Sequence, residues 1–96
     1  MSQAFITGRK TVAVAGTRER LSAVPLQGPF IEIQALASNA GVIVLGDENV
    51  VAAIGTRQGI ALSPGEARGY SWPDLYDLWL DATVNGDGVS YLIKRA

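Results

Sequence analysis

The side chains that could act as catalytic bases in this chain are carboxylates, because its 96 residues include no histidine and no cysteine. Imidazole catalysis, thiolate nucleophiles and the usual zinc sites are therefore excluded. Asp77 and Asp81 stand four residues apart, which in a strand puts them on one face about 13 Å apart, at about 3.3 Å per residue. Two carboxylates that hydrolyse a glycoside need a separation of roughly 5 to 9.5 Å. We expect these charges to be solvated or to lie at an interface, and we expect no enzyme.

The sequence Asn-Gly-Asp-Gly at residues 85–88 has two interpretations. It resembles part of a calcium loop, but such a loop needs further oxygen ligands at fixed spacing and a terminal glutamate, and neither follows here. Asn-Gly is also a strong signal for a β-hairpin turn, and we predict a hairpin. Residues 55–59 contain two glycines but have neither the spacing nor the lysine of a phosphate-binding loop. The sequence therefore predicts no metal and no cofactor.

Most aromatic residues lie in the last third of the chain. They are Tyr70, Trp72, Tyr76, Trp79 and Tyr91. Three interpretations stay open: Trp79, flanked by two leucines, could pin the core; tyrosine and tryptophan could supply contact area at an interface; or they could stack on a sugar. Tyr70, Trp72 and Tyr76 border expected turns, so we assign them to an interface first and to a sugar platform second.

The composition indicates one soluble domain that sits against partners. Charged residues make up 18% of the chain, below the roughly 25% of average domains. The net charge of −1 without a basic stripe argues against nucleic acid as a partner. The longest apolar stretch, residues 41–46, is too short to span a bilayer, and residues 1–10 lack the apolar core of a signal peptide. We expect synthesis in the cytoplasm and no membrane partner.

Short apolar and β-branched runs, separated by glycine, proline and asparagine, recur along the whole chain. The clearest covers residues 30–36, where Ile31, Ile33 and Ala35 share one face and the polar residues between them point the other way. The expected strands cover residues 11–15, 21–26, 30–36, 42–45, 59–62, 66–72, 74–83 and 89–93. The fold class is therefore all-β, a compact β-sandwich or jelly-roll-like barrel of about seven or eight short antiparallel strands.

Turn residues suggest how these strands connect. Proline and glycine in Ser63-Pro64-Gly65 match the second and third positions of a type II turn, and residues 66–72 are expected to pair back across that corner. Residues 1–10 read as an extended arm that precedes a single domain of residues 11–96. The segment Ala4-Phe5-Ile6 is apolar and would gain nothing from exposure at a free terminus. We therefore expect the arm to bind a neighbouring chain.

Several of these motifs, taken in order, carry a resemblance to a known family. They are Thr11-Val12-Ala13-Val14-Ala15-Gly16-Thr17, Ile33-Gln34-Ala35-Leu36, Asn39-Ala40-Gly41, Gly59-Ile60-Ala61-Leu62-Ser63-Pro64-Gly65-Glu66 and residues 78–91. The chain is similar over residues 11–93 to small virion proteins of tailed bacteriophages and prophages, some of which are capsid decoration (cement) proteins. Residues 1–10 and the aromatic run at 70–73 depart from that pattern.

The resemblance implies a compact β-domain that binds the outside of the shell, commonly as a homotrimer at three-fold positions, with the major capsid protein as partner. It implies no catalytic residues, and it implies a virion location after synthesis in the host cytoplasm. The candidate interface residues are Phe5, Ile6, Arg9, Lys10, Arg57, Arg68, Tyr70, Trp72 and Tyr76. Two other functions stay open: a structural adaptor of the tail, neck or fibre, and a carbohydrate-binding receptor module.

Overall fold

The computed structural model describes residues 5–71 and 74–94, and this part of the chain forms two antiparallel sheets of four strands each. Sheet A has the order β1-β8-β3-β6, and sheet B has the order β2-β7-β4-β5. The strands of sheet A are β1 (Phe5–Thr11), β8 (Gly88–Lys94), β3 (Phe30–Ala35) and β6 (Ala67–Ser71). Those of sheet B are β2 (Glu19–Arg20), β7 (Trp79–Ala82), β4 (Ile43–Gly46) and β5 (Ile60–Leu62). A short 3-10 helix, η1 (Ile54–Thr56), lies in the β4–β5 connection.

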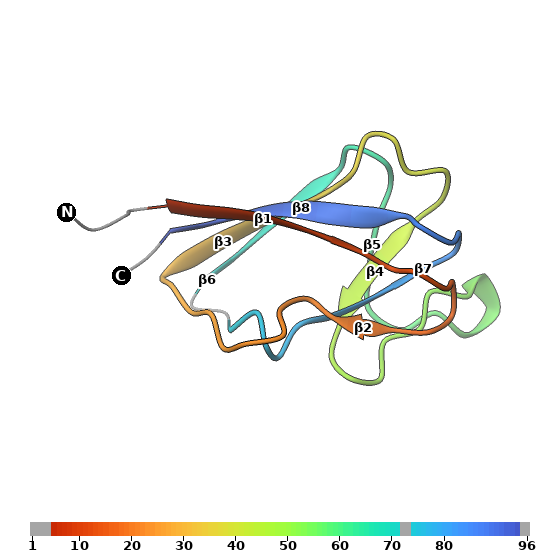
Figure 1. Ribbon diagram of the computed structural model, residues 1–96. Helices are drawn as coiled ribbons and strands as arrows, with labels where there is room; N and C mark the ends of the chain where they lie inside the picture. Colours follow the sequence, from red (N-terminus) through yellow and green to blue (C-terminus); the bar gives the residue numbers. More distant parts are fainter. Residues whose placement is uncertain (1–4, 72–73, 95–96) are drawn as a thin grey trace.

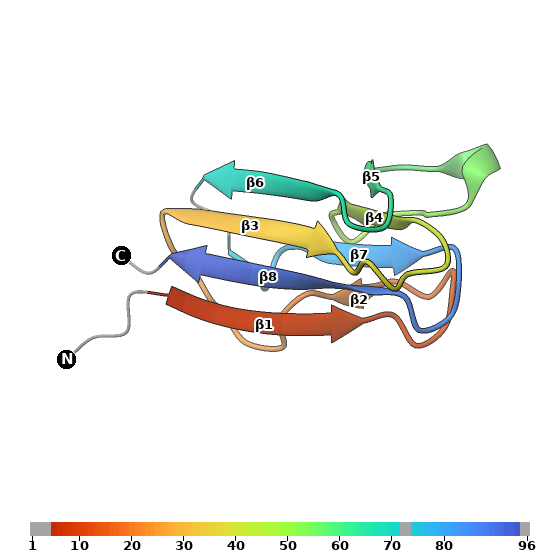
Figure 2. The ribbon, with the colours of Figure 1, turned by 90° about the horizontal axis from the view of Figure 1, so that it is seen from above.

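The strand order is that of a jelly roll. The first strand pairs with the last, β2 with β7, β3 with β6, and β4 with β5, as if one long hairpin were rolled up across two layers. Figure 1 shows the two layers edge-on, and Figure 2 shows sheet A lying over sheet B. The expected all-β sandwich of jelly-roll type is confirmed.

The core lies between the two sheets and is built from inward-facing aliphatic side chains. Its largest fully buried members are Ile31, Ile33, Ile43, Leu45, Leu62, Leu75, Leu80 and Ile93. Strand β3 alternates as its sequence predicts, with Ile31, Ile33 and Ala35 buried and the residues between them exposed. Strand β4 is buried along its first three residues, as expected for a continuous β-branched run with both faces covered.

The N-terminal segment differs from the expectation. Residues 5–11 form strand β1, which pairs along its full length with β8, whereas the strand expected at residues 11–15 is a turn that Gly16 closes at φ +88°. The reason is alternation: Ile6 packs against the core and Val12 is fully buried, which sets the inward phase before residue 11. The prediction of an extended arm is therefore wrong for residues 5–10. Residues 1–4 lie outside the described part of the chain.

The chain turns at both predicted places, but each turn connects strands of different sheets. Gly65 has φ +83°, and the Glu66 amide donates to the Ser63 carbonyl at 2.9 Å, as in a type II turn. The strand that follows, β6, pairs with β3 rather than with β5. Likewise Gly86, at φ +84°, joins β7 of sheet B to β8 of sheet A. The hairpin predicted at residues 85–88 and the pairing across Pro64-Gly65 are therefore wrong, because each turn carries the chain between layers.

Two further strand boundaries differ from the expectation. The short strand expected at residues 21–26 lies earlier, at Glu19–Arg20, and the strand expected over residues 74–83 shrinks to Trp79–Ala82. The Asp74 side chain accepts the Tyr76 amide, and the Asp77 amide donates to the Asp74 carbonyl, so residues 74–77 form a turn. Asp77 and Asp81 consequently do not share a strand face.

Candidate functional site

Three surface regions of the sandwich expose side chains that could contact a ligand or a partner. They are the loop end, where residues 12–18, 53–56 and 83–87 meet; the outer face of sheet A; and a groove on the outer face of sheet B. The buried carboxylates Asp81 and Asp87 fix the loops of the loop end and the loop over sheet B. We describe these supports first.

Asp81 on β7 anchors both the loop end and the β4–β5 connection (residues 47–59), which covers the outer face of sheet B. Its carboxylate is 2% exposed and accepts hydrogen bonds from the backbone amides of Gly16, at 3.0 Å, and Ala52, at 2.9 Å. These two amides belong to the β1–β2 and β4–β5 connections. One side chain on a strand therefore positions two loops that are far apart in the sequence.

Asp87 and Asn39 fix the β3–β4 connection to the start of β8. Asp87 accepts from the amides of Ala40, at 3.0 Å, and Gly41, at 2.8 Å. The Asn39 side chain both accepts from and donates to the backbone of Gly88, at 2.9 Å each. Within the described residues, no buried side-chain nitrogen or oxygen lacks a hydrogen-bond partner. All three polar groups are therefore satisfied as structural clamps.

The loop end carries exposed aliphatic side chains around a shallow hollow. Ile54 in η1 is 84% exposed, and Val14 and Val84 on the neighbouring loops are exposed as well. A hollow of about 410 Å³ lies between the loops and is lined by Ala15, Gly16, Ala53, Ile54, Ala82 and Thr83. These lining side chains are mostly apolar and lack ionisable groups, which suits contact with an apolar protein surface better than binding of a charged ligand.

The outer face of sheet A carries a second apolar surface, which we call the Phe30 patch (Phe5, Phe30 and Leu92). Strand β8 lies between β1 and β3, with Lys94 opposite both phenylalanines. Side chains alternate along strands, so all three patch residues project from the same face. They are 51%, 45% and 40% exposed. The patch lies at the end of sheet A where β1 begins, opposite the loop end (Figure 2).

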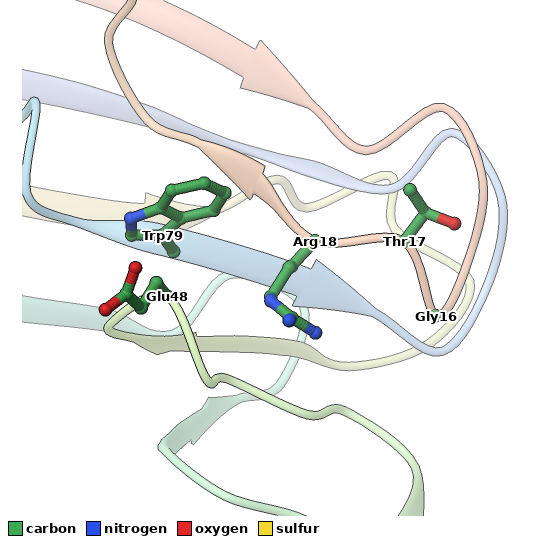
Figure 3. Close-up of a pocket in the computed structure, with 5 residues that line it drawn as sticks. All are labelled: Gly16, Thr17, Arg18, Glu48 and Trp79. Carbon is green, nitrogen blue, oxygen red and sulfur yellow. The ribbon is translucent and has the colours of Figure 1, made fainter.

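The outer face of sheet B differs, because a groove of mixed charge runs over Trp79. We call it the Trp79 groove. It consists of two adjoining hollows of about 420 Å³ and 280 Å³ that share Glu48 and Trp79. Figure 3 shows the first hollow, with Glu48 and Trp79 at one end and Arg18 and Thr17 at the other. The second hollow adds Arg20, Asp47 and Asp77.

Arg20 is held rigidly at the edge of this groove. Its guanidinium carbon lies 3.9 Å from the ring centre of Tyr76 and 4.6 Å from that of Trp79, so it is stacked by cation–π contact with both rings. One nitrogen also donates to the Tyr76 carbonyl at 2.8 Å. The remaining guanidinium N–H groups are left for other acceptors.

Two carboxylates outside the groove have lowered pKa values. Hydrogen bonds from the Tyr76 amide, the Gln27 side chain and the Leu26 amide lower the pKa of Asp74 below 3.8. The hydrogen-bonded Lys10 ammonium, 2.8 Å away, and the Ala13 amide lower the pKa of Glu19 below 4.5. Each stays ionised near neutral pH and serves as an acceptor for its own loop. Neither has the raised pKa of a general acid.

The structure separates the candidate interface residues expected from the sequence. Phe5 lies in the Phe30 patch, and Arg9 and Arg68 are exposed on the edge strands of sheet A. Ile6 and Tyr70 instead pack against the core. They are therefore poor candidates for contact with a partner.

The other four candidates have different surroundings. Lys10 is paired with Glu19, and Arg57 donates two hydrogen bonds to the Ala52 carbonyl, at 3.0 and 2.9 Å, so both cations serve the chain's own loops. Tyr76 stacks on Arg20. Trp72 lies outside the described residues. With Tyr70 packed against the core, Tyr70 and Tyr76 do not form a common stacking platform.

Sequence reasoning did not single out Ile54, Phe30, Leu92 or Arg20. For Phe30 and Leu92 a signal existed: each stands one residue before a buried isoleucine in its strand, so alternation turns it outward. No comparable signal existed for Ile54 and Arg20, because their positions depend on how the loops fold over sheet B.

Among the described residues no group of three or more histidine, cysteine, aspartate or glutamate side chains could hold a metal ion. None of the helical turns in that part of the chain is long and apolar enough to cross a bilayer. Comparisons with protein families, with characterised proteins and with solved structures found no match for this chain.

Proposed function

We propose that the chain is a phage capsid decoration protein that docks on the outside of the shell, with the major capsid protein as its partner. The observation that carries this proposal is the presence of two apolar surfaces at opposite ends of one rigid sandwich: the loop end with Ile54, and the Phe30 patch. A cement protein must bridge neighbouring subunits, and bridging requires two contact surfaces. The jelly-roll strand order is compatible with this role, since viral capsid and lectin domains use it.

The two surfaces suit repeated, modest interfaces. Each docking contact would need about 1,000 Å² of total buried area to be specific, and repetition over the lattice would then stabilise the whole shell. Docking as a homotrimer at three-fold positions is part of the proposal, as is the absence of catalysis, cofactor, nucleic acid and membrane contact. Fold alone does not choose between head and tail. An adaptor of the tail, neck or fibre therefore remains the alternative.

The test is co-sedimentation of the purified chain with expanded, undecorated capsids of its parent phage, with the number of bound copies counted per shell. We expect saturation at a number matching the three-fold positions. No binding would move the protein to the tail or neck. Deletion of residues 1–10 is not a clean companion test, because it removes most of β1, which pairs with β8.

Point variants test the two surfaces separately. Ile54→Asp and Leu92→Asp each put a charge into an apolar surface that docking would bury. Loss of a hot spot at an interface costs about 2 kcal/mol or more, so we expect each variant to bind capsids more than tenfold more weakly. Val24→Asp is the matched control, since Val24 is also an exposed aliphatic residue but lies outside both surfaces. Full occupancy of capsids by both docking variants would contradict the two-surface proposal.

A further inference from the structure

The Trp79 groove contains charged side chains that the rest of the described fold does not engage. Among the described residues, Arg18, Arg20, Glu48 and Asp77 line it without forming an ion pair with one another; the ion pair found in that part of the chain joins Lys10 and Glu19. Asp47 accepts only a local amide, that of Asn49. The groove therefore offers donors and acceptors that stand apart from each other and face solvent.

We infer that the Trp79 groove binds a neutral oligosaccharide. Its two hollows of about 420 and 280 Å³ together fall within the range of small-ligand sites. Guanidinium groups donate hydrogen bonds and carboxylates accept them. A sugar hydroxyl does both, so adjacent hydroxyls can join an arginine on one side to a carboxylate on the other.

The mixed charges of the groove suit a neutral polar ligand better than a simple ion or an apolar molecule. Three carboxylates (Asp47, Glu48 and Asp77) repel phosphate and other anions, and two guanidinium groups (Arg18 and Arg20) repel a cation. A purely apolar ligand would bury these charges without a partner, which is costly. A neutral ligand rich in hydroxyl groups satisfies both signs of charge and leaves none of them unpaired.

The aromatic part of the groove fits the same ligand. Trp79 is half-buried and packs against Val44, Val50 and Ala52, the small apolar cluster under the β4–β5 connection. It lines both hollows. Arg20 is stacked on Trp79 and Tyr76 and hydrogen-bonded to a carbonyl. Its direction is therefore fixed before a ligand arrives, which lowers the entropic cost of binding.

This site differs from the sugar platform considered from the sequence, and it adjoins the loop end, where Gly16 lines both the groove and the loop-end hollow. It uses Arg20 of strand β2 and residues of the β1–β2, β4–β5 and β6–β7 connections around Trp79. The earlier candidates were Tyr70, Trp72 and Tyr76, and of these Tyr76 takes part here through its contact with Arg20. The loop-end hollow and the Phe30 patch contain none of the charged residues invoked here. A decoration protein with this groove would present it on the capsid exterior for attachment to glycans.

The test is an NMR titration of the full chain with trisaccharides of glucose, mannose, galactose and N-acetylglucosamine. We expect at least one to shift the indole N–H resonance of Trp79, identified with the Trp72→Phe variant, and to saturate with a Kd of about 1 mM or lower. Inorganic phosphate and spermidine serve as anionic and cationic probes. A stronger response to either probe than to every sugar would overturn the assignment of a neutral ligand, as would no response to any trisaccharide.

Variants then locate the site. Glu48→Gln and Asp77→Asn keep the shape but remove charged acceptors, and together they should weaken sugar binding about tenfold or more. Arg18→Ala should weaken it in the same direction. Glu32→Gln, on the exposed outer face of sheet A, is the matched control and should bind normally. Amide spectra check that every variant is folded. Unchanged affinity in the Glu48→Gln/Asp77→Asn double variant would show that sugar binds elsewhere and would overturn the site.

Discussion

The outer faces of the two sheets differ in how far the chain itself covers them. The outer face of sheet A is open to solvent and exposes Phe5, Phe30 and Leu92. The outer face of sheet B is covered by its own β4–β5 connection, residues 47–59, whose Val50 and Ala52 pack on Val44 to form a second apolar cluster. A strand pattern that is apolar on both faces needs a cover on both. Sheet B receives that cover from the chain, whereas the patch on sheet A stays exposed.

The cover of sheet B is attached by polar as well as apolar contacts. Asp81 points outward from β7 and accepts the Ala52 amide, while the same carboxylate accepts the Gly16 amide. Sheet A has no comparable buried carboxylate on its outer face among the described residues. The comparison therefore predicts that removal of the Asp81 carboxylate lowers the free energy of unfolding. Substitutions in the Phe30 patch should leave that free energy nearly unchanged.

Asp81→Ala should have the largest effect on stability. The substitution leaves the Gly16 and Ala52 amides without an acceptor, and each unsatisfied buried group costs about 1–3 kcal/mol. We expect the free energy of unfolding to fall by about 2–5 kcal/mol, a large part of the roughly 5–15 kcal/mol of an average domain. Denaturant unfolding followed by far-UV circular dichroism measures it.

The Asp81→Asn variant is the control, because its amide oxygen can still accept one of the two N–H groups. It should lose less stability than Asp81→Ala. Hydrogen exchange of the Ala52 amide should accelerate in both variants, more than exchange in β3. Equal exchange rates at Ala52 in the wild type and in Asp81→Ala would mean that the cover is held without this carboxylate.

Val50→Ala and Leu92→Ser compare the two faces directly. Val50 is buried under the cover, and removal of two carbons at about 0.8 kcal/mol each, with a term for the cavity, should cost about 2 kcal/mol. Leu92 is exposed, so its replacement should change the free energy of unfolding by less than about 0.5 kcal/mol. The same denaturant series measures both. A larger loss for Leu92→Ser would show that the Phe30 patch supports the fold itself.

The sequence predicted the layers of this fold better than its connections. The alternation of Ile31, Ile33 and Ala35 is a local property of one strand, and so is the positive φ of Gly65. Whether a turn returns the chain to the same sheet or carries it to the other depends on which strands pair over long distances. Neither Pro64-Gly65 nor Asn85-Gly86 specifies which strands pair after the turn. Local sequence therefore predicts a hairpin at both places, and both predictions are wrong.

The candidate sites were predictable to a similar, limited extent. Phe5 was selected for its apolar type, and it does lie on an exposed surface. Arg57 was selected for its charge beside a turn, but its guanidinium is bonded to the Ala52 carbonyl. Arg20 was not selected, although it is fixed between two rings. A side chain's freedom is set by neighbours that are distant in the sequence, and residue type alone does not report it.

Acid should remove the contribution of the surface anchor Asp74 to stability. Asp74 ties the β2–β3 connection to the β6–β7 connection through the Leu26 and Tyr76 amides, and these bonds together with that from Gln27 lower its pKa below 3.8. The folded state therefore binds this proton less readily than the unfolded state. The stability that Asp74 contributes is fully present above pH 3.8 and is lost as the pH falls through the lower pKa of the folded state.

Comparison of the wild type with Asp74→Asn from about pH 6 to pH 2 checks this sign. The wild type should be the more stable of the two near neutral pH, and the gap should close below pH 3.8. High salt should leave the gap largely intact because it arises from hydrogen bonds, whereas the partly exposed Lys10–Glu19 pair is screened. A gap that widens in acid would mean that the carboxylate of Asp74 prefers to be protonated in the folded state. The hydrogen bonds at this anchor would then not act on the charged form.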